Sequence, residues 1–253
     1  MDRNFNVDGY AHPNTRRIEA SRMVENNLPN HVAIVPDGNR RWAAMKGVPR
    51  IEGHRLGAAR MHEIVDEMIH RKVKYLTVWG FSCDNWKRSQ EEVADIFNLL
   101  RIWIEKDAPW LHENGVRLKH IGNLSGLPQV IQDVIIKAID LTKGNSGMTL
   151  NLAVNYSGRE DILNAVHRII IEDVPRSSVD ESLFNSHLYT CGMPDVDLVI
   201  RTADEFRMSN FMLWQTAYAE FVFTPVLWPD FDAMELEKAL NVYADRKRRH
   251  GGD

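Results

Sequence analysis

A loop with one aspartate and two arginines follows the first apolar run of the chain and carries the residue types of a metal–diphosphate site. Directly after the run 31–35 the chain reads Pro36, Asp37, Gly38, Asn39, Arg40, Arg41 and Trp42. A glycine beside an asparagine lets backbone N–H groups converge on an anion, and two guanidinium groups supply forked donors for phosphate oxygens. Mg²⁺ is usually held by one or two carboxylates together with substrate phosphates. The loop therefore predicts that Asp37 meets a metal ion and a diphosphate.

A plainer interpretation of this first loop stays open, in which Asp37 caps the helix that follows and the arginines are solvated. Two later loops favour the chemical interpretation, because each again follows an apolar run and carries arginine. The loop over residues 82–88 contains Ser82, Asn85, Trp86 and Arg88, and the loop over residues 201–210 contains Arg201, Arg207 and Ser209. Together the three loops predict one diphosphate site at the first loop and a second one at the last.

Glu220 begins the last apolar run of the sequence, in the stretch AYAEFVF. A carboxylate in an apolar setting is costly unless it is paired or bound to a metal. Two interpretations follow: Glu220 is a second metal ligand, or it forms a buried ion pair with one of the loop arginines.

The segments that position these loops alternate between two hydrophobic patterns. Apolar runs rich in β-formers occupy residues 31–35, 75–81, 116–122, 148–156, 196–201 and 221–228. Several are apolar on both faces, which is typical of central strands in a parallel sheet covered by helices. Helical periodicity covers residues 61–68, 91–113, 129–142, 159–172 and 232–248. The alternation favours one three-layer α/β domain over residues 31–253, with ligands at the carboxyl ends of the strands. Residues 1–30 read as a loosely ordered extension.

Composition narrows the class of protein. The net charge of -4 gives no reason to expect nucleic acid as a partner. Cys83 and Cys191 are the only cysteines and lie far apart, so we expect no disulfide framework and a reducing, cytoplasmic setting. No run approaches the roughly 18 apolar residues of a membrane span, and the N-terminus lacks the apolar core of a signal peptide. P-loop, GxGxxG and GxSxG patterns are missing, as is the DDxxD motif expected of a trans-type prenyl synthase.

Five stretches of the chain resemble the cis-prenyltransferase family, which includes undecaprenyl diphosphate synthase. They read HVAIVPDGNRRWA, GHRLGA, FSCDNWKRSQEEV, LVIRTADEFRMSNFMLWQTAYAEF and FTPVLWPDFD. The resemblance implies a central, mostly parallel six-stranded sheet surrounded by helices. It also implies an Mg²⁺-dependent synthase that joins an allylic diphosphate to isopentenyl diphosphate, and a homodimer paired through the C-terminal strand and helix.

The same resemblance implies roles for the matching residues. Asp37 is implied to handle Mg²⁺ and ionise the allylic substrate, Asn85 to help remove a proton, and Glu220 to be a second Mg²⁺ ligand. The residues implied to surround the allylic diphosphate are Gly38, Asn39, Arg40, Arg41, Trp42, Arg50 and His54. Those implied to cover the reacting carbons are Ser82, Asn85, Trp86 and Arg88. Those implied to bind isopentenyl diphosphate are Arg201, Arg207 and Ser209.

The chain departs from the usual family pattern at several positions. Pro36 stands where methionine is common, Arg40 where a second glycine is common, and Cys83 where serine is commoner. The usual RTGGE becomes RTADE at 201–205, which removes two glycines that permit close backbone approach. It also introduces Asp204 beside the expected second diphosphate, so either the second substrate sits differently, or Asp204 points away or binds metal.

An allylic carbocation needs an apolar chamber that excludes water, and the broad apolar face of residues 91–113 predicts one wall of it. Ordinary core packing is the plainer interpretation of Phe97 and Trp103 taken singly, but Trp103 on this wall favours a short-chain product. Two alternatives remain open. The RTADE loop raises the possibility of irregular, head-to-middle coupling of two allylic diphosphates. The other alternative is a non-catalytic accessory subunit, which the retained site residues disfavour.

Overall fold

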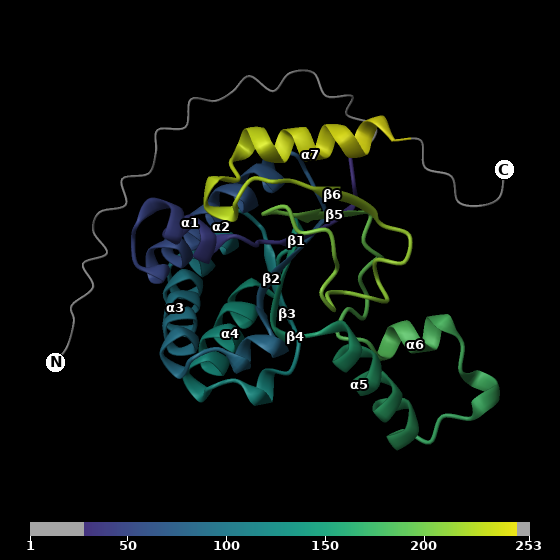
Figure 1. The fold of residues 1–253 in the computed structure, drawn as a ribbon. Helices are drawn as coiled ribbons and strands as arrows, with labels where there is room; N and C mark the ends of the chain where they lie inside the picture. Colours follow the sequence, from purple (N-terminus) through teal and green to yellow (C-terminus); the bar gives the residue numbers. More distant parts are fainter. Residues whose placement is uncertain (1–27, 247–253) are drawn as a thin grey trace.

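Six strands form one sheet in the computed structural model, which describes residues 28–246 (Figure 1). They are β1 (His31–Val35), β2 (Tyr75–Ser82), β3 (Arg117–Ile121), β4 (Thr149–Tyr156), β5 (Leu198–Arg201) and β6 (Glu220–Phe223). The strand order is β3-β4-β2-β1-β5-β6, and every neighbouring pair is parallel. The predicted α/β sheet is therefore confirmed, and it is wholly rather than mostly parallel within the described residues. The carboxyl ends of β1, β2 and β5 consequently lie at one edge.

Seven α-helices connect and cover the strands in the described part of the chain. They are α1 (Asn39–Lys46), α2 (Arg50–His70), α3 (Gln90–Glu113), α4 (Gln129–Thr142), α5 (Gly158–Ile171), α6 (Glu181–His187) and α7 (Ala233–Asp245). Figure 1 shows α5 and α6 together, with the strands between them and the group formed by α2, α3 and α4. The periodic helices were predicted, whereas no hydrophobic period marks the short helices α1 and α6.

The sheet separates two apolar cores. From β1, Val32 and Ile34 enter the larger core, to which α2, α3, α4 and α7 contribute, and Ala33 and Val35 enter the smaller one. Because successive residues of a strand point to opposite faces, β1 is buried on both faces, as its continuous apolar run predicts. Burial of apolar area stabilises the fold by about 25 cal/mol per Å². Burial on both faces therefore holds β1 in place and supports the loop that follows it.

Two predicted boundaries need correction. The run 221–228 is a strand only as far as Phe223, because Pro225 lacks the N–H that a ladder hydrogen bond requires. The C-terminal helix ends at Asp245, and Lys247 and the basic residues after it lie outside the described residues. Most of the predicted N-terminal extension, residues 1–27, also lies outside them.

Candidate functional site

A cavity of about 320 Å³ opens at the carboxyl ends of β1, β2 and β5. This volume lies at the small end of the range of roughly 300–1,000 Å³ for small-molecule sites. Its polar lining includes eight of the predicted site residues: Asp37, Asn39, His54, Ser82, Asn85, Arg88, Arg201 and Ser209. The three loops singled out by sequence therefore meet, as parallel strand ends must.

The inner part of the cavity is apolar and lies between α2 and α3. Its lining there includes Ala58, Met61, Ile96, Leu99, Leu100 and Trp103. Trp103 also belongs to the larger core, so both interpretations of this residue hold. Phe97 packs against the rings of Phe81 and Trp86 and does not line the cavity, so core packing is the correct interpretation for it.

The carboxylate of Asp37 is bound by the guanidinium of Arg201. Arg201 Nε and Nη2 both donate to Asp37 Oδ2, at 3.0 and 2.7 Å, and Arg201 is almost fully buried. Asp37 is not the helix cap of the plainer interpretation, because the N-cap of α1 is Gly38 in a left-handed conformation (φ 112°). The aspartate side chain is thus free of a capping role, and its Oδ1 has no hydrogen bond within residues 28–246.

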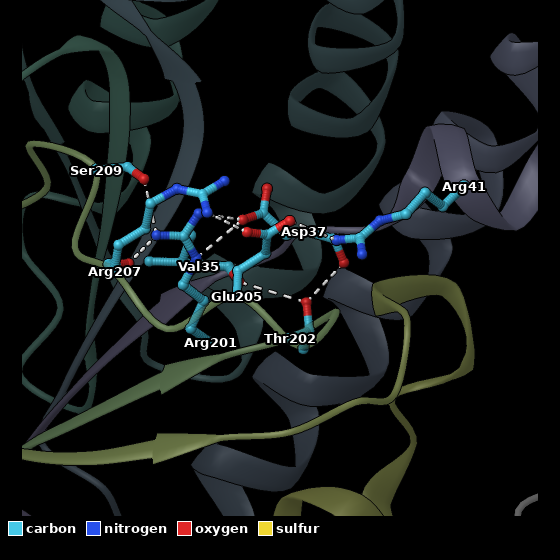
Figure 2. A network of polar contacts seen from close by, with 8 residues as sticks. All are labelled: Val35, Asp37, Arg41, Arg201, Thr202, Glu205, Arg207 and Ser209. Atoms are coloured by element: carbon cyan, nitrogen blue, oxygen red, sulfur yellow. Dashed lines mark hydrogen bonds and ion pairs between the residues drawn. The ribbon is translucent and has the colours of Figure 1, made fainter.

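A second set of ion pairs lies beside this contact, as Figure 2 shows. Arg201 Nη1 donates to Ser209 Oγ at 2.9 Å and to the backbone carbonyl of Arg207. Glu205 bridges the guanidinium groups of Arg41 and Arg207, at 3.0 and 2.5 Å. The residues predicted for the two diphosphates are therefore joined by one carboxylate that the sequence analysis had not assigned.

The RTADE loop keeps the backbone shape that glycines would normally supply. Ala203 and Asp204 both have left-handed dihedrals, with φ values of 72° and 57°, a conformation that costs residues other than glycine about 1–2 kcal/mol. Their N–H groups donate to the carbonyls of Val226 and Thr224. These amides are therefore occupied, and the Asp204 side chain is exposed, which leaves the three alternatives for this residue open.

Glu92, in the first turn of α3, is the residue on which four predicted site residues converge. Arg88 donates to it at 3.0 Å, and three more nitrogens lie within 4.0 Å, those of Arg40, Arg50 and His54. Burial lowers the pKa of His54 to about 4, with a further lowering from Arg88, so its ring is neutral at pH 7. Sequence analysis missed Glu92, because Ser89-x-x-Glu92 is the pattern of a helix capping box.

The loop after β2 is held by its own side chains. Asn85 Oδ1 accepts from the N–H of Ser82 at 3.0 Å, and Ser82 Oγ accepts from the N–H of Asp84. Trp86 donates to Asn155 Oδ1 at 2.8 Å and does not line the cavity. Burial and the Glu160 carboxylate raise the pKa of the Cys83 thiol to about 12, so it stays protonated. Asn85 thus faces the cavity with its amide nitrogen available.

Eight of the predicted site residues do not line the cavity, and Trp42 and Glu220 are two of them. Trp42 donates to Asp230 Oδ1 at 2.9 Å and packs on that loop, so a direct substrate contact is not supported. Glu220 is level with Leu198 at the start of β5, about 10 Å along the strands from the level of Arg201. It is half-buried and paired with Arg246. Its partner is thus an arginine outside the three loops, and the role of Glu220 as a second metal ligand stays a prediction.

Close packing of α1 on α2 fixes the first loop. A Cβ on Gly53 would lie 2.1 Å from the carbonyl oxygen of Asn39, and one on Gly57 would lie 2.5 Å from Asn39 Oδ1. The two glycines of the GHRLGA stretch therefore let α1 touch α2 without a gap. Because neither glycine has a side chain, α1 can approach α2 closely, and this approach places Asn39 in the lining of the cavity.

His62, on α2, is paired with a carboxylate of α3. Its Nδ1 lies 3.1 Å from Oδ2 of the buried Asp107, and its ring packs on Trp110. The hydrogen bond to Asp107 raises the pKa of His62. The pair joins α2 to α3, the two helices that enclose the apolar part of the cavity.

Comparison with known proteins agrees with this architecture. A family model described as "Putative undecaprenyl diphosphate synthase" matches residues 35–251. An isoprenyl transferase of Clostridium perfringens is 42% identical over 97% of this chain and 99% of its own length. One from Oceanobacillus iheyensis is 46% identical over 89% and 91%.

Two solved structures share the fold. Lavandulyl diphosphate synthase from Lavandula x intermedia, in complex with dimethylallyl diphosphate, has a TM-score of 0.85 and 39% identity, covering 88% of this chain and 98% of its own. A probable undecaprenyl diphosphate synthase from Campylobacter jejuni has a TM-score of 0.75 and 30% identity, with 89% and 99% covered. The chain belongs to the undecaprenyl diphosphate synthase family of isoprenyl transferases and is a prenyltransferase of the cis-prenyltransferase type.

Proposed function

We propose that the protein is an Mg²⁺-dependent prenyl diphosphate synthase that joins an allylic diphosphate to isopentenyl diphosphate and gives a short-chain product. The observation that carries this proposal is the two-part cavity. Charged side chains, among them Asp37, Arg88 and Arg201, line one part of it, and apolar side chains of α2 and α3, including Trp103, line another. An isoprenoid diphosphate has the same division between a charged head and an apolar chain.

The arrangement suits a reaction through a carbocation. When the allylic C–O bond breaks, its electron pair leaves with the diphosphate, whose growing charge the arginines around Glu92 and Glu205 can neutralise. The apolar wall of α2 and α3 keeps water from the cation. The double bond of the second substrate then supplies the electrons of the new C–C bond, and the adjacent carbon gives up a proton to an oxygen of the released diphosphate. We propose that Asn85 orients that carbon.

The donor set fits Mg²⁺ with one protein carboxylate. Asp37 offers a free oxygen at the cavity, and Mg²⁺ is commonly held by one or two carboxylates plus substrate phosphates and water. No group of three or more histidine, cysteine, aspartate or glutamate side chains suited to a metal occurs within residues 28–246. Bound Mg²⁺ would supply Lewis-acid neutralisation of the leaving diphosphate, and Asp37 would be the residue that holds it.

Product analysis tests the proposal. Purified protein with Mg²⁺ is given dimethylallyl, geranyl or farnesyl diphosphate, each with and without isopentenyl diphosphate. We expect linear products that require isopentenyl diphosphate and Mg²⁺. If no substrate pair yields product while the protein is folded, the proposal is wrong.

Irregular coupling of two allylic diphosphates is the second candidate. It is favoured by the likeness to lavandulyl diphosphate synthase and by the RTADE loop, whose Ala203 and Asp204 amides are tied to residues 224 and 226. Branched products formed from dimethylallyl diphosphate alone would establish it. The same product analysis therefore decides between the two candidates.

Trp103 is proposed to limit product length. Its large side chain lines the apolar end of the cavity between α2 and α3. Replacing it by leucine keeps an apolar side chain but opens space, so we expect the product to grow by at least about one isoprene unit at a moderate cost in stability. Chromatography of the dephosphorylated products measures this. Ile136→Ala, on the exposed face of α4, is the control and should leave the product distribution unchanged.

We propose a homodimer in the cytoplasm. The strand β6 lies at the edge of the sheet and leaves one side unpaired. Exposed aromatic side chains lie beside it, including Phe206 and Tyr218. No helix among the described residues is long and apolar enough to cross a membrane. Both cysteines are free thiols, which suits a reducing compartment.

A further inference from the structure

Glu92 holds together basic side chains that come from three separate segments. Arg40 lies on α1, Arg50 and His54 on α2, and Arg88 follows the loop after β2. Glu92 itself is about one-tenth exposed, so the attraction acts in a poorly solvated position and is stronger than on the open surface. Without a carboxylate there, three guanidinium groups would repel one another beside the cavity, which Arg88 lines.

The contacts leave most of the arginine donors available. Only Arg88 makes a hydrogen bond to Glu92, at 3.0 Å. Arg40 and Arg50 lie 3.8 Å from its oxygens, which is beyond the usual 2.7–3.2 Å of an N–H···O bond. These two guanidinium groups are therefore attracted by charge while their N–H groups remain free for another anion.

The cluster also carries excess positive charge and contains a buried polar atom without a hydrogen-bond partner. Three arginines and one glutamate give +3 − 1 = +2, because His54 is neutral. His54 Nε2 is buried without a hydrogen-bond partner, and His54 lines the cavity. Buried polar atoms normally have partners. A net positive cluster with an unpartnered imidazole nitrogen is suited to a polyanion.

We propose that Glu92 is a positioning residue for the diphosphate site, which keeps Arg40, Arg50 and Arg88 in place so that their free donors can bind the diphosphate of the allylic substrate. The inference rests on the proposed function and adds a residue that holds the cations without taking up their hydrogen bonds. Its benefit is preorganisation, because the cost of ordering the arginines is met before the ligand arrives.

Two simpler roles for Glu92 give different expectations. As an acidic residue in the first turn of α3 it would affect only the stability of that helix, through its favourable charge at the positive end of the helix dipole. As a competing anion it would weaken diphosphate binding, so that its neutralisation would tighten binding. Preorganisation predicts the opposite sign.

A double-mutant cycle separates these roles. Inorganic pyrophosphate binding is measured by calorimetry without divalent metal for the full-length wild type, Glu92→Gln, Arg50→Gln and the double variant. We expect Glu92→Gln to weaken binding about tenfold, which corresponds to ~1.4 kcal/mol. Arg50→Gln should also cost about tenfold in the wild type but less than about threefold in the Glu92→Gln background, since coupled residues are non-additive.

The controls keep the result specific. Glu91→Gln makes the same change one residue earlier on an exposed side chain of α3 and should leave binding within about twofold. Glu92→Asp keeps the charge and should retain most of the coupling. Glu92→Ala, which also removes the carboxylate, replaces Glu92→Gln in the cycle if the latter does not fold by circular dichroism.

Equal or tighter binding by Glu92→Gln, or strictly additive costs, would overturn the proposal. Wild-type product formation is measured in parallel. If turnover is normal but the binding costs of the two substitutions are additive, only the role of Glu92 is wrong. If the binding costs are coupled but no product forms, the proposed reaction is wrong.

Discussion

Replacing Asp37 by asparagine is expected to reduce turnover about a thousandfold while pyrophosphate binding without metal changes by less than about threefold. The substitution keeps the shape of the side chain but removes the charge that would hold Mg²⁺ and help neutralise the leaving diphosphate, an effect of the size seen when one such electrostatic contribution is lost. The arginines that attract the diphosphate remain, so binding and chemistry should separate. Steady-state rates and calorimetry measure the two effects.

The ion pair with Arg201 adds a cost in stability. Arg201 is buried, and removal of one partner from a fully buried pair costs about 3–5 kcal/mol. Asp37 is 39% exposed on its side chain, so solvent screens the pair and we expect about 1–3 kcal/mol. Alanine would add a lost contact, which makes asparagine the cleaner variant. Asp140→Asn, in an exposed ion pair on α4, is the control. Near-normal turnover by Asp37→Asn would remove Asp37 from the reacting centre.

Gly53→Ala is expected to destabilise the protein by about 3 kcal/mol and to weaken pyrophosphate binding at least tenfold. The new methyl group would meet the backbone carbonyl of Asn39 at 2.1 Å. Backbone cannot rotate away as a side chain can, so α1 must move, and overpacking of this kind costs about 1–3 kcal/mol or more. Asn39 and Arg40 move with α1, which is why binding should fall as well. Urea unfolding and calorimetry give the two values.

A matched glycine shows whether the effect is one of packing. A Cβ on Gly144 would have no neighbour within 4 Å, and its backbone is not left-handed. Gly144→Ala should therefore change the free energy of unfolding by less than about 0.5 kcal/mol. If Gly53→Ala were as stable as this control, the close approach of α1 to α2 would not be what fixes the first loop.

The main strands and long helices could be predicted because their patterns are local. The run 31–35 is apolar throughout, and β1 is buried on both faces. The prediction failed where a local signal was misjudged or missing: Pro225 shortens β6, and α6 has seven residues, too few for a clear period. The meeting of Asp37 with Arg201 followed from the rule that parallel strand ends share one edge.

Prediction of the remaining parts of the site needs tertiary packing or strand direction. Glu92 and Glu205 join residues that are distant in the chain, and only tertiary packing brings their partners together. Strand direction is what Glu220 requires, because it begins β6 and so lies at the opposite end of the strands from residues that follow them. Its role as a metal ligand stays a prediction.

The backbone hydrogen bonds of Ala203 and Asp204 have a mechanical consequence. They tie the loop that carries Arg207 to residues 224 and 226, directly after the edge strand β6. Both residues are already in left-handed conformations, so the loop has little freedom to bend independently. The loop over residues 201–210 and the end of β6 are therefore coupled. A shift of residues 224 and 226 would be passed through these hydrogen bonds to Ala203 and Asp204.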